Sequence, residues 1–103
     1  MDEGSPTGDE LVALLAALAS PHRMRVMAAL AGGRNYVSQL ARDLGISRAL
    51  LQVHLKKLEA AGLVSSALEV SEDGKAMNYY EVVPFAVRLT PETLERASAT
   101  LTL

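Results

Sequence analysis

The spacing of apolar residues follows a helical period through most of this 103-residue chain. Near the N-terminus, leucines at positions i, i+3, i+4 and i+7 would share one helix face; these are Leu11, Leu14, Leu15 and Leu18. Similar apolar stripes recur in four later segments. The pattern predicts helices over residues 9–19, 21–31, 37–44, 48–61 and 91–101.

Residues that favour helix ends bound most of these segments. Serine, threonine and asparagine side chains can accept a hydrogen bond from the free amides of the first turn. Proline suits the first helical position, and Ser20–Pro21 and Thr90–Pro91 combine both features. The expected N-caps are Ser20, Asn35, Ser47 and Thr90, and the expected helix stops are Gly32–Gly33, Gly45 and Gly62.

Between the fourth and fifth predicted helices the apolar period changes to two. Alternation over residues 64–71 is typical of a strand, and residues 78–83 form the expected return strand. The turn Glu72–Lys75 contains an Asp-Gly pair, which supplies the positive φ values that a tight hairpin requires. Pro84 cannot donate to a ladder, so pairing is expected to stop there.

The predicted order is helix, helix, helix, turn, helix, hairpin, helix. A short third helix, a tight turn and a longer fourth helix form a helix-turn-helix, and the hairpin after it is a wing. The expected fold class is therefore α+β, mainly α: a winged helix-turn-helix with five helices and a β-hairpin wing. Residues 1–8 are expected to be a flexible tail, and residues 9–103 the winged helix-turn-helix domain.

Positive charge is concentrated in the middle of the chain, although the net charge is −2. Residues 21–57 contain seven Lys or Arg and one Asp, whereas residues 1–20 contain four acids and no base. A basic helix-turn-helix matches the phosphate backbone of DNA. A solvated helix surface has the same composition, so charge alone does not decide between the two.

Several chemistries lack the residues that they need. There is no cysteine, which excludes disulfides and thiolate ligands, and the only histidines are His22 and His54. No paired carboxylates, phosphate-binding glycine loop or Ser/His/Asp constellation supports an enzyme. The apolar run Leu11–Ala19 is shorter than the ~20 residues that span a bilayer, and the N-terminus is acidic. We expect a soluble cytoplasmic protein with no cofactor, no metal and no membrane partner.

Four stretches resemble the winged helix-turn-helix repressors of the ArsR type. They are Ser20–Val26, Tyr36–Ser47, His54–Val64, and Asp73–Lys75 followed by Tyr80. The resemblance covers about residues 10–100. It implies a homodimer joined through the first and last helices, with two recognition helices in successive major grooves of double-stranded DNA. The metal-ligand patterns of that family, Cys-x-Cys near the third helix or Asp and His on the last, are absent, so the effector is unknown.

The fourth predicted helix has a core face and an outer face. Leu51, Leu55 and Leu58 form the core stripe. A step of about 100° per residue puts the other side chains opposite or beside that stripe; they are Arg48, Ala49, Gln52, Val53, Lys56 and Lys57. Arg48 suits a guanine, Gln52 an adenine, and Val53 a thymine methyl group.

Further polar residues are expected to hold phosphates. They are Ser38, Gln39, Arg42, Ser47, His54, Lys56, Lys57, and Lys75 at the wing tip. Ser38 and Gln39 begin the third helix, where amide donors and the helix dipole favour an anion. A solvated role is the alternative for these residues, and His54 is equally suited to packing inside the domain.

Apolar residues of the first and last helices are expected to form the dimer interface. The set is Leu11, Leu14, Leu15, Leu18, Leu94, Ala97 and Leu101. With Val12 added, the leucine face of the first helix is wider than the core of one chain needs. It is therefore expected to serve both the core and the interface.

The sequence thus predicts a sequence-specific DNA-binding transcriptional regulator that binds a pseudo-palindromic operator as a homodimer, with repression implied by the resemblance. The alternative is a winged-helix protein–protein adaptor with no specific DNA binding. Adaptors lose the basic helix face, whereas Arg48, Gln52 and Lys56–Lys57 are retained here, which favours DNA.

Overall fold

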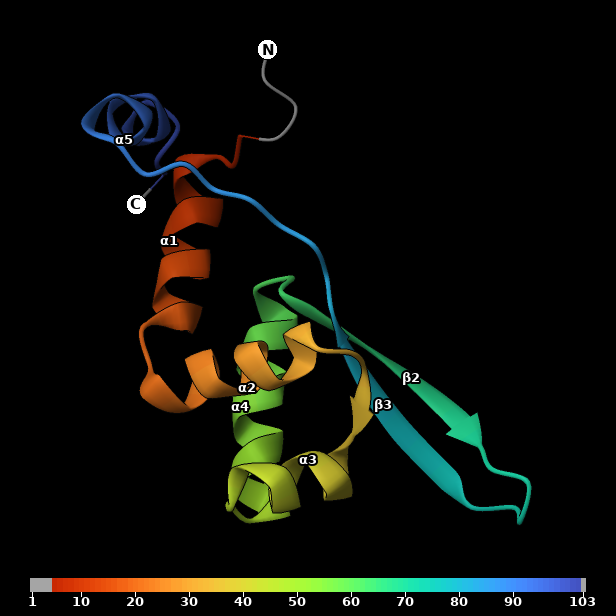
Figure 1. The fold of residues 1–103 in the computed structure, drawn as a ribbon. Coiled ribbons are helices and arrows are strands. Elements are labelled where there is room, and N and C mark those ends of the chain that lie inside the picture. Colours follow the sequence, from red (N-terminus) through yellow and green to blue (C-terminus); the bar gives the residue numbers. More distant parts are fainter. Residues whose placement is uncertain (1–4, 103) are drawn as a thin grey trace.

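The computed structural model describes residues 5–102, which form five helices and a three-stranded antiparallel sheet (Figure 1). The elements are α1 (Gly8–Leu18), α2 (Pro21–Ala31), β1 (Asn35–Tyr36), α3 (Val37–Leu44), α4 (Arg48–Ala60), β2 (Val64–Val70), β3 (Ala76–Val82) and α5 (Pro91–Ser98). The hairpin of β2 and β3 extends away from the helices, and α5 lies near the N-terminal end of α1 (Figure 1). The predicted fold class, a mainly helical winged helix-turn-helix, is confirmed.

Side-chain caps set where three of the helices begin. The predicted caps Ser20, Ser47 and Thr90 each accept a hydrogen bond from the backbone N–H three residues ahead, at 3.3, 3.0 and 3.1 Å respectively. Such a cap contributes about 1 kcal/mol. Pro21 and Pro91 occupy the first helical positions, as predicted. These helix starts are therefore encoded by neighbouring residues alone.

The fourth expected cap, Asn35, is wrong. Tyr36 holds the N-cap position of α3 and makes no side-chain cap bond. Asn35 lies in β1 and pairs with Tyr80 of β3, and its side chain accepts from the N–H of Tyr36 at 2.8 Å. Sheet pairing, which joins residues far apart in the sequence, overrides the local cap signal here.

The core lies between α2, α3, α4 and the start of the hairpin. The predicted stripe Leu51, Leu55 and Leu58 is fully buried, with 0% of each residue exposed. It belongs to one cluster with Val26, Leu30, Val37, Leu40, Ala41, Leu63, Val64 and Tyr80. Burying one such leucine contributes about 1.5–3 kcal/mol. The buried inner face of α4 therefore fixes the position of the helix and leaves its outer face exposed.

The sheet has the order β1–β3–β2, so the hairpin carries one short extra strand. β2 and β3 pair over their full length, and residues 71–75 form the loop between them. Within this loop only Gly74 has a positive φ, which is 83°. Asp73 does not have a positive φ. The predicted turn is in the right place, but it is a longer loop than a two-residue Asp-Gly turn. Strand β1 is not among the predicted elements, and its pairing with β3 joins the wing to the helix-turn-helix.

The two ends of the described chain meet beside α1. This helix begins at Gly8, one residue before the predicted start, because Thr7 forms a capping box with Glu10. Gly8 belongs to the helix and not to the expected tail, and residues 1–4 of that tail lie outside the described residues. The last helix is shorter than predicted, since α5 ends at Ser98 and Leu101 follows in a turn.

α1 and α2 meet at a sharp bend of 93°. Pro21 lacks the N–H that would continue α1, so the chain turns at Ser20 and starts a new helix. In the described part of the chain, no single helix is long and apolar enough to cross a membrane. The bent pair α1 and α2 meets that test only when both helices are counted together.

Candidate nucleic-acid interface

The turn between α3 and α4 aims the start of α4 outward. Gly45 ends α3 with a φ of 67°, a left-handed conformation that glycine adopts without strain. The N–H of Ile46 then donates to the carbonyl of Ala41 at 3.1 Å, which holds the turn against α3. Ser47 caps α4 directly afterwards. The buried leucines fix the rotation of α4, so its first turns face solvent.

The predicted base-reading residues lie on this outer face. Arg48, Ala49 and Val53 are exposed and Gln52 is partly exposed. Val53 keeps 51% of its surface exposed although it is apolar. An exposed valine on a helix gains no burial energy within the chain, which suits a residue that packs against a binding partner.

A groove of about 430 Å³ joins three elements beside this face. Five predicted residues line it: Ser38, Arg42, Arg48, Gln52 and Lys75. They come from α3, α4 and the hairpin loop, so the fold brings together positions up to 37 residues apart, from Ser38 to Lys75. Sequence reasoning missed Tyr36, Leu68 and Asn78 in the same lining. The pairing of the strands puts them there, and no local sequence pattern indicates it.

A chain of hydrogen bonds ties the outer face of α3 together. Arg42 donates to the side-chain oxygen of Gln39 at 2.7 Å, and the Gln39 amide donates to Asp43 at 2.7 Å. Asn35 donates to the other oxygen of Asp43 at 3.3 Å. Both ends of the Gln39 side chain are therefore occupied. Gln39 therefore helps to orient Arg42, which favours a bracing role over its predicted contact with phosphate.

His54 is buried, which favours the alternative of packing over a contact with phosphate. Only 8% of the residue is exposed, and its Nδ1 lies 3.4 Å from a guanidinium nitrogen of Arg23. Its ring stacks on His22 with centroids 5.3 Å apart, and its Nε2 has no hydrogen-bond partner among the described residues. Burial lowers the pKa of His54 below its usual value, and the nearby charge of Arg23 lowers it further. The neutral ring therefore fits the alternative of packing between α2 and α4.

The remaining predicted phosphate ligands are exposed. Lys57 and Lys75 form no ion pair within the described residues, and the Lys56 ammonium lies 4.0 Å from a carboxylate oxygen of Glu59. Such a surface pair is weak and competes poorly with a phosphate. The Ser47 hydroxyl accepts from the N–H of Leu50, which leaves its own O–H free to donate.

The middle of the hairpin is held by a cluster that the sequence reading did not single out. Arg34 pairs with Glu69 through two hydrogen bonds and stacks over the Tyr79 ring at 4.1 Å. The Tyr79 ring meets Tyr36 edge-on, with centroids 5.8 Å apart. The Arg34 hydrogen bonds lower the pKa of the Glu69 carboxyl. This cluster joins β1, β2 and β3 and so sets the direction of the wing.

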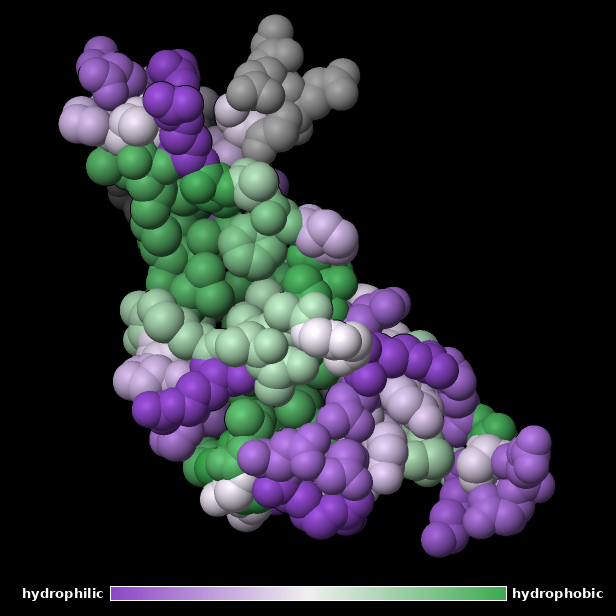
Figure 2. Space-filling view, viewed as in Figure 1, coloured by the Kyte–Doolittle hydropathy of each residue, from purple (hydrophilic) through white to green (hydrophobic). Residues whose placement is uncertain are grey.

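The opposite end of the molecule carries the predicted dimer residues. Leu11 and Ala97 are already buried within the chain, and Leu14 and Leu18 pack partly on the core. Leu15, Leu94 and Leu101 remain exposed. Apolar surface gathers over α1, whereas the surface near the hairpin is mostly hydrophilic (Figure 2). The sequence reading missed three exposed apolar residues of the segment that leads to α5: Val83, Phe85 and Leu89.

The fold and this interface define a winged helix-turn-helix transcriptional regulator. The sequence pattern of the family described as bacterial regulatory protein, arsR family, matches residues 20–66. An uncharacterised HTH-type transcriptional regulator of Methanocaldococcus jannaschii is 31% identical over 87 residues, covering 84% of this chain and 90% of that protein. The chain belongs to the ArsR family of bacterial regulatory proteins.

Two solved structures share the architecture. The solution structure of a homodimeric winged helix-turn-helix DNA-binding domain from Mycobacterium bovis, described as a possible ArsR-family regulator, is 26% identical with a TM-score of 0.65, covering 72% of this chain and 64% of that one. HlyU from Vibrio cholerae is 22% identical with a TM-score of 0.65, covering 96% of this chain and 92% of that one. The likeness to HlyU shows the fold alone, but it extends from α1 to α5.

Proposed function

We propose that this chain is a repressor that binds a pseudo-palindromic DNA operator as a homodimer. The observation that carries the proposal is the groove where Arg42, Arg48 and Lys75 meet from three elements, with no acidic residue in its lining. A cationic groove between a recognition helix and a wing fits a phosphate strand flanking a major groove. Membership of the ArsR family supports the same function.

Base readout is assigned to the first turns of α4. Arg48 offers a planar fork to the O6 and N7 of guanine, and Gln52 offers a paired donor and acceptor to adenine. Val53 packs on a thymine methyl group, and the small Ala49 lets the helix approach the base edges closely. Because only two of these four residues are polar, part of the discrimination is assigned to the shape of the DNA.

Phosphate contacts are assigned to exposed donors around that helix. They are Arg42, Ser47, Lys56, Lys57 and Lys75, together with the partly exposed Ser38. Each lysine or arginine that neutralises a phosphate releases counterions, so binding weakens steeply with salt. Gln39 braces Arg42, and His54 supports α4 from inside. Neither is assigned a contact with DNA.

The dimer is assigned to the apolar end. Leu15, Leu94 and Leu101 are exposed there, and Val12 of α1 and Phe85 of the segment before α5 are exposed as well. A contiguous apolar surface of this kind marks an interaction site, and a twofold axis through it makes the same patch meet itself. The homodimeric state of the related Mycobacterium bovis domain supports this arrangement. Two recognition helices would then lie roughly 34 Å apart, one turn of DNA.

A protein–protein adaptor is the second candidate. Leu50 and Val53 of α4 are exposed and apolar, and Leu68 is an exposed apolar residue of the groove lining. A protein partner would bury them. The basic groove has no role in that case, which is why DNA is preferred.

The test is selection from a random duplex library followed by sequencing, with affinities measured by fluorescence anisotropy. The wild type is compared with the triple variant Arg48→Ala/Lys56→Ala/Lys57→Ala. A control variant, Arg25→Ala, removes an exposed charge outside the groove. We expect a palindromic motif for the wild type and the control and none for the first variant.

Single variants separate the two kinds of contact. Arg48→Ala should change the preferred base at one position of each half-site. Lys57→Ala should weaken binding to all duplexes alike and reduce the salt slope by about one. Wild-type protein that shows no salt-sensitive binding at low ionic strength would refute the DNA proposal and favour the adaptor.

A further inference from the structure

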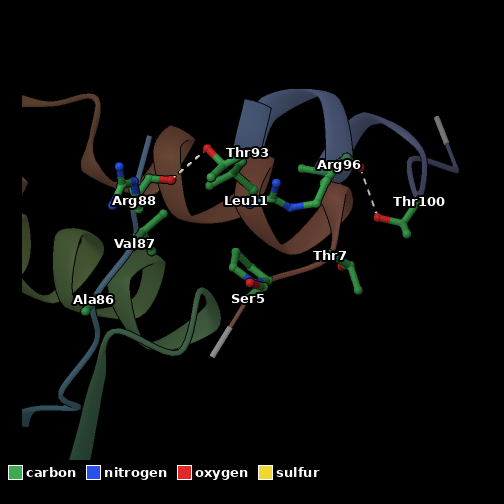
Figure 3. A pocket seen from close by; sticks show the side chains of 11 residues that line it. Ser5, Thr7, Leu11, Ala86, Val87, Arg88, Thr93, Arg96 and Thr100 are labelled. Carbon is green, nitrogen blue, oxygen red and sulfur yellow. Dashed lines mark hydrogen bonds between the residues drawn. The ribbon is translucent and has the colours of Figure 1, made fainter. Parts of the chain in front are cut away.

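A cavity of about 750 Å³ lies at the other end of the molecule, away from the DNA-facing groove (Figure 3). Its walls come from three segments: residues 5–11 at the start of α1, residues 86–88 of the segment before α5, and α5 with the turn after it. Ligand pockets in proteins span about 300–1,000 Å³. The cavity is therefore large enough for a small organic molecule.

The inner wall of this cavity is apolar. Leu11, Val87 and Ala97 line it together with Pro6. Leu11 and Ala97 are buried within the chain, so they form a fixed wall rather than a free surface. A hydrocarbon body placed against them gains burial energy of about 25 cal/mol per Å² of apolar area.

The hydroxyl groups of Thr93 and Thr100 beside the cavity are already engaged. Thr93 donates to the carbonyl of Arg88 at 2.8 Å, as Figure 3 shows. Thr100 donates to the carbonyl of Ala97 at 3.0 Å and accepts from the N–H of Gly8 at 2.7 Å. Their bonds hold α5 to α1 and to the segment before it. The hydrogen-bonding capacity that is left for a ligand belongs mainly to two arginines.

Arg96 and Arg88 give the cavity its charge. The Arg96 side chain extends from α5 across the space next to Leu11, and Arg88 stands on the opposite side (Figure 3). No Asp or Glu lines the cavity, and neither arginine forms an ion pair with any described residue. A guanidinium at the edge of an apolar wall matches a carboxylate attached to a hydrocarbon body.

We propose that this cavity binds a small organic acid, whose carboxylate is held by Arg96 with help from Arg88 and whose apolar body lies against Leu11, Val87 and Ala97. Its regulatory consequence rests on the proposed function. α1 and α5 form the cavity and also carry the proposed dimer surface, so a bound acid fixes the position of α5 on α1. That position sets the distance between the two recognition helices, which couples the acid to operator affinity.

The test titrates the full chain with octanoate and with phenylacetate, using calorimetry and ¹H–¹⁵N NMR. Octanamide and phenylacetamide are the neutral controls. We expect one saturable site per chain for at least one acid, with shifts centred on the amides of Val87 and Thr93. Binding of the matching amide should be at least about tenfold weaker, because a charge-assisted bond is lost. No saturable binding of either acid at millimolar concentration would overturn the proposal.

Arginine variants locate the site. Arg96→Gln should weaken binding of the acid by about tenfold or more, and Arg88→Gln by less. The matched control Arg25→Gln removes an exposed arginine of α2 and should leave acid binding unchanged. Equal binding by Arg96→Gln and the wild type would overturn the assignment. The assignment would also be overturned if NMR showed that methyl groups of a second copy fill the cavity in the dimer.

Operator affinity is measured separately, with and without octanoate. Wild-type protein that binds its selected operator but no acid refutes this inference and leaves the proposed function intact. Protein that binds the acid but no DNA refutes the proposed function and leaves the acid site intact.

Discussion

The two ends of this molecule are built in different ways. At the DNA-facing end, α2, α3 and α4 pack around fully buried leucines, and caps lie within three residues of the amides that they bind. At the other end, α5 is joined to α1 by contacts between residues more than 90 positions apart. Gly8 donates to Thr100 at 2.7 Å, and Thr102 donates to Asp9 at 3.0 Å.

The two ends differ in how fully one chain alone completes their packing. The core of the DNA-facing end, which includes Leu51, Leu55 and Leu58, is fully buried within one chain, so the position of α4 does not depend on a partner. The apolar end leaves Leu94 48% exposed and keeps an open cavity next to Leu11. One end can therefore present a fixed surface to DNA, while the other end is suited to pairing and to control.

The largest effect should come from the core of the DNA-facing end. Leu55→Ala empties a fully buried position of α4 and should lower the free energy of unfolding by about 2–5 kcal/mol. Urea denaturation followed by circular dichroism measures this loss. Leu68→Ala removes the same atoms from a residue that is 70% exposed and should cost less than about 0.5 kcal/mol. Similar losses for the two variants would contradict the packing described here.

The next effect probes the junction at the apolar end. A Cβ at Gly8 would lie 2.2 Å from the carbonyl oxygen of Ala97 and 2.8 Å from the Leu101 side chain. Gly8→Ala should therefore push α5 off α1, at a cost of about 1–3 kcal/mol. We expect faster hydrogen exchange in α5 and weaker self-association in sedimentation velocity.

Gly32→Ala is the matched control for this junction. Gly32 has an ordinary φ of −80°, and the nearest atom to its added Cβ would be 3.8 Å away. This variant should leave both hydrogen exchange in α5 and self-association unchanged. If Gly8→Ala behaved like Gly32→Ala, α5 would not be docked on α1 as described.

The same contrast explains what the sequence could predict. Ser20, Ser47 and Thr90 act on amides three residues away, so local composition was enough to place three helix starts. The core stripe of α4 follows from helical geometry alone. Its outer face follows by exclusion, which is why the sequence alone predicts Arg48 and Gln52 as base-reading residues.

The sequence does not predict contacts between residues that are far apart along the chain. The sequence predicts Gly8 in a tail, because no residue near it in the sequence indicates its contact with the carbonyl of Ala97. It predicts a cap at Asn35, because the strand partner Tyr80 is 45 residues away. His54 lies at the edge of the core stripe, where a small rotation of the helix decides between burial and exposure. Only packing against α2 settled that choice.

A smaller effect should follow from removing a local cap. Ser47→Ala deletes the acceptor for the Leu50 N–H, and we expect a loss of about 0.5–2 kcal/mol in the free energy of unfolding. Ser47→Thr keeps a hydroxyl in place and should recover most of that stability. If the threonine variant were as unstable as the alanine variant, the capping bond would not be the cause.

The smallest effect should be a pH dependence at the seam between α2 and α4. The groups that face His54 are Arg23 and His22 from α2 and Lys57 from α4, and burial followed by these charges lowers its pKa in the folded state. In the unfolded chain the ring titrates near 6.5. As the pH falls below that value, the unfolded state takes up a proton that the folded state resists, so stability decreases until the lowered pKa is reached.

The variant His54→Leu isolates this contribution. It removes the titrating group while keeping an apolar side chain between α2 and α4. Between about pH 7.5 and pH 5.5, the wild type should lose more unfolding free energy than the variant does. The effect is small because it arises from one side chain. An equal loss in both proteins would assign the pH dependence to other groups and would mean that His54 is not held neutral against Arg23.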